Sequence, residues 1–315
     1  MLDLILILCL TAMGFFVGTL SSFFGFGGGF IIVPFLVSLG FPINISVGTS
    51  TMEIFISSLI ASLKHRRLGN VGMKAGLIIA FASIVGAEFG AQLIEWLEGS
   101  SIQHMDILVS LIYVLVLYSI SAYMTYEGLI SKRRGGSEKK FWRGPKIPQF
   151  TITMQQDMKP TSAWVLVIIG FLGGLFAGFL GTSGGLILVP LLIYVVGYKP
   201  SVAAGTCIFE RLLSCLYASL THTLKGNIDF MLAALMFLGS LIGVQVGVSA
   251  TKYISEASFK GALVLYLGFI SLSVMMRLIS LLFGIFFLEI LSRLIIFLAS
   301  FSMALLIIAF LIGKI

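Results

Sequence analysis

Long apolar runs, separated by short polar segments, cover almost the whole chain. Crossing the hydrocarbon core of a bilayer takes about 20 mostly apolar residues. The runs that predict membrane-spanning helices are 2–24, 45–63, 71–95, 104–129, 163–180, 203–224, 228–252, 258–282 and 285–312, with shorter apolar segments at 30–40 and 186–198. The pattern predicts an all-α integral membrane protein, a polytopic helical bundle with almost no sequence left for a soluble domain.

Composition supports this class. Apolar residues make up 58% of the chain and charged residues 10%, and the mean hydropathy is +1.10. A surface of that composition is solvated by lipid rather than water. The first run begins Met1-Leu2-Asp3, without Lys or Arg and without a small-residue cleavage pattern, so we expect a retained helix and not a secretion signal. A multi-pass protein of the cell membrane is the expected location.

The two halves of the chain match each other. Residues 14–37 match 170–193 at 11 of 24 positions without a gap, and residues 48–70 match 205–227 at 11 of 23. Internal similarity of this kind indicates a duplicated unit. The matched polar pairs, which are hard to obtain by chance in an apolar background, are Thr49/Thr206, Glu53/Glu210, His65/His222 and Asn70/Asn227.

These matches divide the chain into four parts. We predict a first transmembrane repeat at 1–130, a basic loop at 131–160, a second repeat at 161–283 and an extra C-terminal helix at 284–315. Within 131–150 the loop holds seven Lys or Arg residues against one acid, Glu138. A basic loop between membrane helices indicates the cytoplasmic side. Anionic lipid headgroups are the expected partner of residues 131–146, in preference to nucleic acid.

Charge in the short loops predicts how the repeats are related. The loop from Lys64 to Lys74 is basic, whereas the matching loop of the second half holds only Lys225 beside Asp229. The loop that matches the acidic stretch at 95–98 gains Lys252 and Lys260 instead. Opposite charge in matching loops favours inverted repeats, with five passes in each half. Four passes in each half would make the repeats parallel.

Glycine clusters interrupt both halves at matching places. The clusters consist of Gly25, Gly27, Gly28 and Gly29 with Phe26 in the first half, and of Gly181, Thr182, Ser183, Gly184 and Gly185 in the second. Pro34 and Pro190 follow at the same spacing. Glycines permit a helix to break, and a break inside lipid is tolerable only beside protein or a water-filled cavity. The free N–H groups of the following half-helix then form an anion site. An alternative explanation of the glycine clusters is that they let helices pack closely. Neither cluster has the sequence pattern of a nucleotide-binding loop.

Polar residues of the next apolar run are expected to line the same cavity. Glu53 and Glu210 lie inside these runs, shortly after Thr49 and Thr206. Ionisable groups at such depth usually face a polar cavity, where they pair, bind ions or carry protons. A structural cap near a helix N-terminus is the alternative for both glutamates.

Arg211 occurs in the second half alone, where it offers a counter-charge to an anionic substrate. Its match in the first half is Ile54, so the two halves cannot be chemically equal. Near-neutral titration makes His65 and His222 candidates for proton coupling beside Glu53 and Glu210. The alternative is that the histidines bond the turns that follow them.

Glu88 is a further candidate proton carrier, and it lies in a stretch of small residues expected to pack closely. In the last helix Glu289 and Arg293 are four residues apart, a spacing that predicts an ion pair on one face.

The doubled Gly-rich segment ending in Val-Pro, the Gly-Thr stretch after it, and the His followed by Gly-Asn in each half resemble the sulfite exporter TauE/SafE family of membrane transporters. The resemblance covers residues 10–280 and leaves out the basic loop and the last helix. It implies movement of sulfite, sulfoacetate or another small sulfur-containing or organic anion, without selecting among them.

Residues and resemblance together predict a secondary transporter that exports a small anion, coupled to a proton or cation, by alternating access between the glycine breaks. An uncoupled anion channel, an intramembrane enzyme and a structural subunit are the alternatives. An enzyme would need a nucleophile, a metal cluster or paired carboxylates on one face, and the sequence shows no such set. We expect no catalytic residue, no metal and no cofactor.

Overall fold

A computed structural model describes residues 4–98, 102–133, 151–152, 161–180 and 184–314. The first half contains α1 (Leu4–Phe24), α2 (Gly29–Ser38), α3 (Ile43–Arg67), α4 (Met73–Glu98) and α5 (Ile102–Arg133). The second half contains α6 (Ala163–Leu180), α7 (Gly185–Leu191), the π-helical segment η1 (Leu192–Val196), α8 (Pro200–Leu224), α9 (Phe230–Thr251), α10 (Glu256–Phe283) and α11 (Phe286–Ile312). The predicted all-α fold is confirmed, with a two-residue antiparallel pairing of β1 (Thr151–Ile152) and β2 (Thr161–Ser162) as a minor addition.

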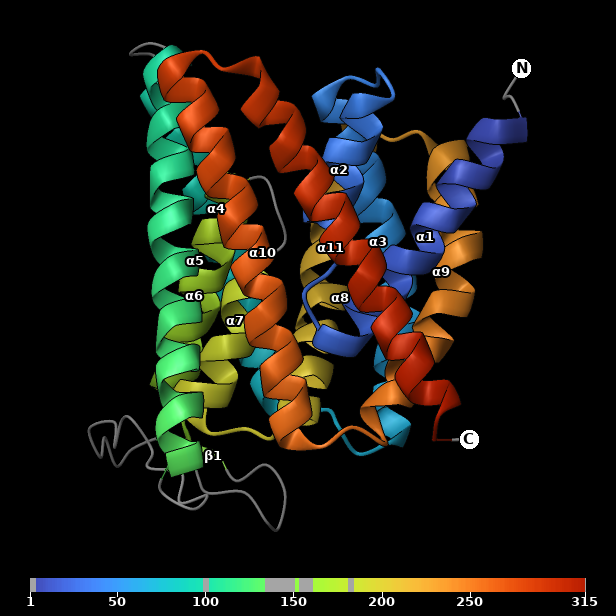
Figure 1. Cartoon of the computed structure of the whole chain (residues 1–315), viewed down its shortest axis with the longest axis vertical. Helices are drawn as coiled ribbons and strands as arrows, with labels where there is room; N and C mark the ends of the chain where they lie inside the picture. The colour runs from blue at the N-terminus through green and yellow to red at the C-terminus, as the bar shows by residue number, and fades with distance from the viewer. Residues whose placement is uncertain (1–3, 99–101, 134–150, 153–160, 181–183, 315) are drawn as a thin grey trace.

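Within the part of the chain that the structure describes, six helices are long and apolar enough to cross a membrane, namely α1, α3, α4, α9, α10 and α11. The helices stand side by side as one bundle (Figure 1). In that view α1 begins at the top, beside the N-terminus, whereas α6 follows the β-strands at the bottom. The two halves therefore start at opposite ends of the bundle.

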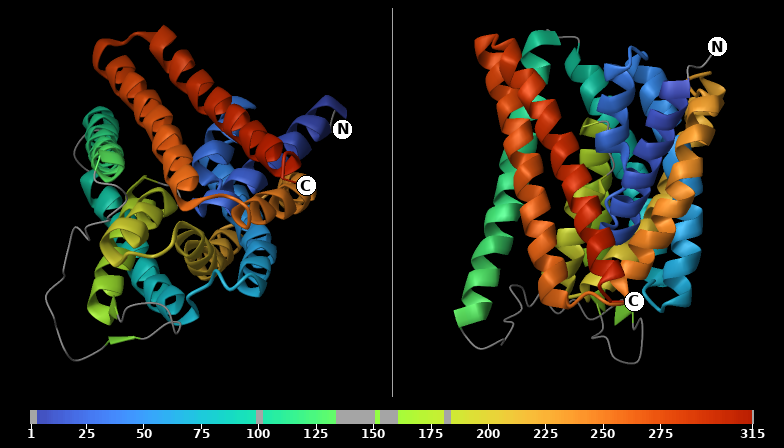
Figure 2. Two further views of the ribbon diagram at one scale, coloured as in Figure 1. Left: turned by 60° about the horizontal axis from the view of Figure 1, so that its bottom comes forward. Right: turned by 45° about the vertical axis from the view of Figure 1, so that its right-hand side comes forward.

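The halves pack crosswise and not each upon itself. The first helix of one half lies along the fourth helix of the other, because α1 packs mainly on α9 and α4 mainly on α6. The third helices α3 and α8 pack against each other at the centre, and α5 packs on α10 (Figure 2). Residues far apart in the sequence thus form the core between the halves.

Small residues allow the two crosswise pairs to approach closely. A Cβ atom placed on Gly239 or Gly243 of α9 would overlap the backbone carbonyl of Thr11 or Phe15 in α1. On α6, the same substitution at Gly174 would overlap the carbonyl of Ser83 in α4. Lipid provides no hydrophobic drive for helices to associate, so association relies on this close packing.

The last two helices brace the first half. The Tyr266 hydroxyl of α10 hydrogen-bonds the Ser300 hydroxyl of α11 at 2.9 Å. The Tyr266 ring stacks on Phe24 and Phe26, with centroid distances of 5.7 and 5.9 Å.

The predicted ion pair of α11 is confirmed, because Arg293 and Glu289 approach to 2.6 Å.

We predict that Gly239→Ala destabilises the protein by about 1–3 kcal/mol, because the added methyl group has no room against the α1 backbone. Gly261→Ala on α10 is the matched control, since a Cβ atom there meets nothing within 4 Å. Thermal unfolding of both variants in detergent measures the difference. Equal melting temperatures would show that the α1–α9 contact does not depend on glycine.

Candidate functional site

The start of each central helix, α3 or α8, contacts the connection that follows the other helix. The Thr49 hydroxyl on α3 accepts a hydrogen bond of 3.0 Å from the backbone N–H of Asp229, which precedes α9. The Thr206 hydroxyl on α8 accepts one of 3.0 Å from the N–H of Gly72, which precedes α4. Both threonine side chains are fully buried. These contacts give Thr49 and Thr206 a structural role at the entry of the next helix.

The first glycine break lies between α1 and α2. Gly25 and Gly27 have φ angles of +83° and +74°, a left-handed conformation that favours glycine. The ten-residue helix α2 begins at Gly29, and the preceding Gly28 has no side chain that could cap it. The first N–H groups of α2 therefore receive no acceptor from a capping side chain. The ring of Phe26 stacks on Phe24 at 5.0 Å and anchors the break in the core.

The second glycine break, between α6 and α7, contacts the first. A Cβ atom on Gly185 would lie 2.6 Å from the carbonyl oxygen of Phe26 and 2.8 Å from that of Gly25. Gly184 lies against the backbone of Gly173 in α6. Gly181, Thr182 and Ser183 fall outside the described residues. The two breaks are therefore in contact at Gly185.

Arg211 of α8 lies at this junction. Its side chain is buried, with 2% exposed, and its Nη1 donates a hydrogen bond of 2.7 Å to the carbonyl oxygen of Gly25. A Cβ atom on Gly185 would overlap its Nη2, so the guanidinium touches both breaks. Nη2 has no hydrogen-bond partner among the described residues. The junction therefore presents a buried cation with a donor still free.

At Arg211 the first break presents an acceptor, while anion binding by the N–H groups of the breaks stays a prediction. We expected the glycine breaks to offer backbone N–H donors, yet the groups that face Arg211 from the first break include the carbonyl of Gly25. Carbonyls are acceptors, so they hold the guanidinium and do not bind an anion themselves. The free donor at the junction comes from the side chain of Arg211.

Glu53 and Glu210 occupy matching positions on α3 and α8, with 1% and 2% exposed. Each carboxyl lies beside a serine one turn further along its own helix and a serine from the other half. Ser57 and Ser240 are the neighbours of Glu53. Ser214 and Ser83 are the neighbours of Glu210, which also has Arg211 as a neighbouring charge.

The sequence reasoning missed these four serines. Serine is common in membrane helices and carries no charge, so single serines gave no signal. The signal that could have found them is the repeat itself, because the spacing that joins Glu53 to Glu210 also joins Ser57 to Ser214 and Ser83 to Ser240.

The histidines occupy different surroundings. His65 is fully buried, and its Nε2 donates a hydrogen bond of 2.9 Å to the carbonyl oxygen of Ser22 in α1. His222 is partly exposed at the end of α8, beside Gly48. The contact of His65 joins α3 to α1, and not to the turn after α3 as the alternative explanation expected. Nothing tests a proton-coupling role for either histidine.

Glu88 lies away from the junction. Its side chain is exposed on α4 and accepts a hydrogen bond of 3.1 Å from Gln92. The expectation that it faces a close-packed surface is wrong, because Gly86 and Gly174 make the contacts between α4 and α6 while Glu88 points outward. Its matched residue, Gln245, accepts a hydrogen bond of 2.6 Å from Lys64.

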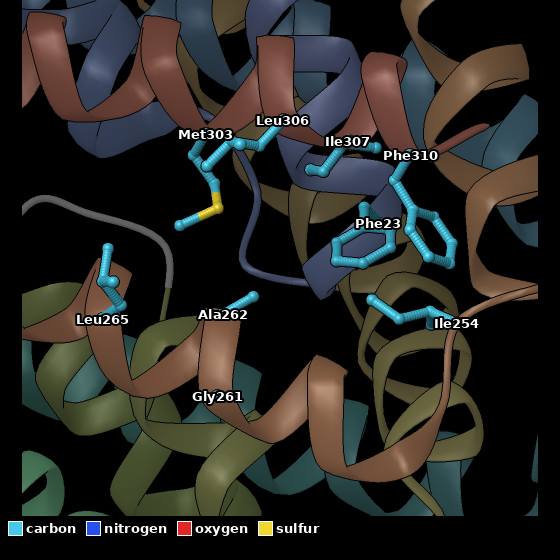
Figure 3. Close-up of a pocket in the computed structure, with 9 residues that line it drawn as sticks. All are labelled: Phe23, Ile254, Gly261, Ala262, Leu265, Met303, Leu306, Ile307 and Phe310. Atoms are coloured by element: carbon cyan, nitrogen blue, oxygen red, sulfur yellow. The ribbon is translucent and has the colours of Figure 1, made fainter. Parts of the chain in front are cut away.

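A separate cavity of about 190 Å³ lies between α10, α11 and the end of α1 (Figure 3). Its lining is almost entirely apolar and includes Phe23, Leu265, Met303 and Phe310. Such a lining offers no counter-charge or donor side chain to an anion. Arg211 and the glycine breaks remain the candidate anion site.

Comparison with known proteins gives a family match. The family model described as Sulfite exporter TauE/SafE matches residues 10–274. The probable membrane transporter protein YunE of Bacillus subtilis is 27% identical over 252 residues, which cover 77% of this chain and 88% of the relative. A probable membrane transporter protein of Methanocaldococcus jannaschii is 27% identical over 284 residues, 85% of this chain and 95% of the relative.

A plant relative matches a shorter stretch. Sulfite exporter TauE/SafE family protein 6 of Arabidopsis thaliana is 29% identical over 119 residues, which cover 34% of this chain and 28% of the relative. No solved structure gave a match. The family match spans both glycine breaks and both central helices, and the chain therefore belongs to the sulfite exporter TauE/SafE family of membrane transporters.

Proposed function

We propose that this protein is a secondary transporter that exports a small anion, such as sulfite, a sulfonate or a related organosulfur anion, coupled to a proton or cation. The observation that carries the proposal is the buried guanidinium of Arg211, which touches both glycine breaks and keeps Nη2 without a partner. The name of the plant relative supports sulfite as the first anion to test.

The chemistry of the junction suits an oxyanion. A guanidinium presents several donors in one plane and matches the oxygens of a carboxylate, phosphate or similar anion. A buried donor without a partner is unfavourable, and an anion oxygen would satisfy it. The α2 N-terminus, which begins at Gly29, adds the positive end of a helix dipole.

Alternating access follows from an inverted arrangement of two repeats, which we propose for this chain. The crosswise pairs α1–α9 and α4–α6, and the opposite starting ends of α1 and α6, support it (Figure 1). Transporters built this way bind substrate at broken helices between the repeats and expose the site to each side in turn. The contact of Gly185 with Gly25 and Phe26 would then open toward one side at a time.

Basic residues suggest which end of the bundle is cytoplasmic. The bottom of Figure 1 holds the α3–α4 connection, with Arg66 and Arg67, and the α9–α10 connection, with Lys252. Cytoplasmic loops carry an excess of Lys and Arg. We propose that this end faces the cytoplasm of a cell membrane. The loop 131–160 would lie at the same end, and anionic lipid would bind residues 131–146. Of residues 131–146, only 131–133 at the end of α5 belong to the described residues.

We predict that sulfite raises the unfolding free energy of the wild type in detergent and that Arg211→Lys loses about half of this gain or more. A ligand at 100 times its Kd contributes about 2.7 kcal/mol. Lysine keeps the charge but not the planar donors, so we expect binding to weaken at least about tenfold, or about 1.4 kcal/mol. Thermal unfolding with sulfite, sulfate, thiosulfate, sulfoacetate, taurine and simple carboxylates provides the measurement.

Arg277→Lys is the matched control for this experiment, because Arg277 is exposed on α10 and far along the chain from both breaks. It should keep the full response to sulfite. A response that Arg211→Lys retains would exclude the junction as the anion site. A flat response across all the anions would remove the support for an anion transporter.

The orientation is tested by labelling single cysteines in cells. Arg67→Cys and Lys225→Cys lie at exposed ends of the antiparallel helices α3 and α8. In a Cys9→Ser background, which leaves the buried Cys207 and Cys215, a membrane-impermeant maleimide should label position 225 in intact cells. Position 67 should react only after the membrane is opened. The reverse pattern would place the basic end outside.

A further inference from the structure

We propose that Glu53 is the proton carrier of this transporter and that it holds its proton in the conformation described above, while Glu210 balances the charge of Arg211. The division of roles rests on the proposed anion transport, which it deepens by naming the coupling ion and its site.

The first observation is the isolation of Glu53. Its carboxyl is buried in a membrane-spanning helix, and neither of its oxygens has a hydrogen-bond partner among the described residues. An ionised carboxylate without a partner or counter-charge is strongly unfavourable in such surroundings. Its match Glu210 has Arg211 as its neighbour in sequence, where Glu53 has Ile54. The first half therefore buries an acid without a base.

The second observation is the direction of the neighbouring hydroxyl groups. Ser57 donates its hydroxyl hydrogen to the carbonyl of Ile54 at 3.2 Å, and Ser240 donates to the carbonyl of Phe237 at 3.1 Å. A hydroxyl has one hydrogen to donate, so while these two bonds hold, Ser57 and Ser240 have only acceptor lone pairs left for the neighbouring Glu53. Acceptors repel a carboxylate but receive a hydrogen bond from a protonated carboxyl. Ser50, one turn earlier, is buried without a partner and donates nothing to Glu53.

The surroundings contain few other charges. Helices α1, α2 and α9, which pack against α3, contain no Asp, Glu, His, Lys or Arg within their described bounds. On α8, the titratable and charged groups near Glu53 are Glu210, Arg211 and Cys215, whose thiol lies within electrostatic range of all three charged groups. On α3 itself, the nearest titratable groups are Lys64 and His65, 11 and 12 residues away, or about 16 and 18 Å along the helix.

Protonation of Glu53 and anion binding then favour each other. Glu210 and Arg211 are together neutral, so an arriving anion adds a negative charge near Glu53. An ionised Glu53 would repel that charge, and linkage makes the effect reciprocal. The O–H bond of Glu53 forms with a proton from water on the loading side and breaks when the proton returns to water on the other side. Anion and proton thus cross in the same direction, so during export the proton leaves the cytoplasm with the anion, and the outward concentration gradient of the anion drives both.

A metal cation fits this place less well than a proton. Hard cations take about six or more oxygen ligands. Among the described residues, no group of three or more His, Cys, Asp or Glu side chains could hold a metal ion. Glu53 is the only carboxylate of α3. The test is therefore carried out without sodium.

The first experiment detects the proton without any transport. Infrared spectra of the full-length protein in vesicles at neutral pH should contain a protonated-carboxyl C=O band that Glu53→Gln removes. Glu88→Gln is the matched control, because Glu88 is exposed on α4 and accepts a bond from Gln92. Glutamine mimics a protonated carboxyl, so Glu53→Gln should also melt close to the wild type. A spectrum unchanged by Glu53→Gln, or a collapse of its stability, would overturn the proposal.

The second experiment tests coupling in proteoliposomes with labelled sulfoacetate, whose charge is constant near neutral pH, and with the membrane potential clamped by potassium and valinomycin. In the wild type, a pH difference of about one unit should change the sulfoacetate ratio across the membrane about tenfold. Glu53→Gln should exchange sulfoacetate with the same ratio at every pH, and Glu88→Gln should behave as the wild type. A Glu53→Gln variant that still follows the pH gradient would overturn the proposal.

The two experiments separate the two ideas. If the wild type moves no sulfoacetate or sulfite, the proposed transport fails, while loss of the infrared band in Glu53→Gln still establishes the proton on Glu53. If the wild type transports but shows no such band, anion transport stands and Glu53 is not its proton carrier.

Discussion

A helix that breaks inside a membrane leaves backbone carbonyls without donors, and in this protein Arg211 supplies the donor that the first break needs. Its hydrogen bond to the carbonyl of Gly25 joins a helix of the second half to the interrupted helix of the first. Gly185 approaches this guanidinium closely because it has no side chain, and a larger residue at position 185 would collide with it. Backbone satisfaction and the candidate anion site are therefore one structure.

The two halves use similar sequences for different purposes. The central helices share Gly-Thr at the start, Glu in the middle and Gly-Asn at the end, and these shared residues build matching contacts such as those of Thr49 and Thr206. The exchange of Ile54 for Arg211 breaks the match directly after the two glutamates. A cation in one half alone gives the junction a single charged donor, and it leaves the two glutamates in unequal surroundings.

Much of the fold and part of the site could be predicted from the sequence. Apolar runs gave the helices, and glycine clusters gave the two breaks, because both signals depend on composition alone. The direction of the groups at the junction could not be predicted, since whether Gly25 turns its N–H or its C=O toward Arg211 depends on the φ and ψ angles of the break. The outward position of Glu88 was missed for a related reason, because small neighbours do not tell which face of α4 packs on α6.

The crosswise pairing of α1 with α9 has a consequence for biosynthesis. Translation proceeds at about 5–20 residues per second, so on the order of ten seconds or more separates the emergence of these two helices. During that interval α1 lies in the membrane without the partner whose glycines fit its backbone. The same holds for α4 until α6 follows it. The newly made first half thus lacks its main packing partners until the second half inserts.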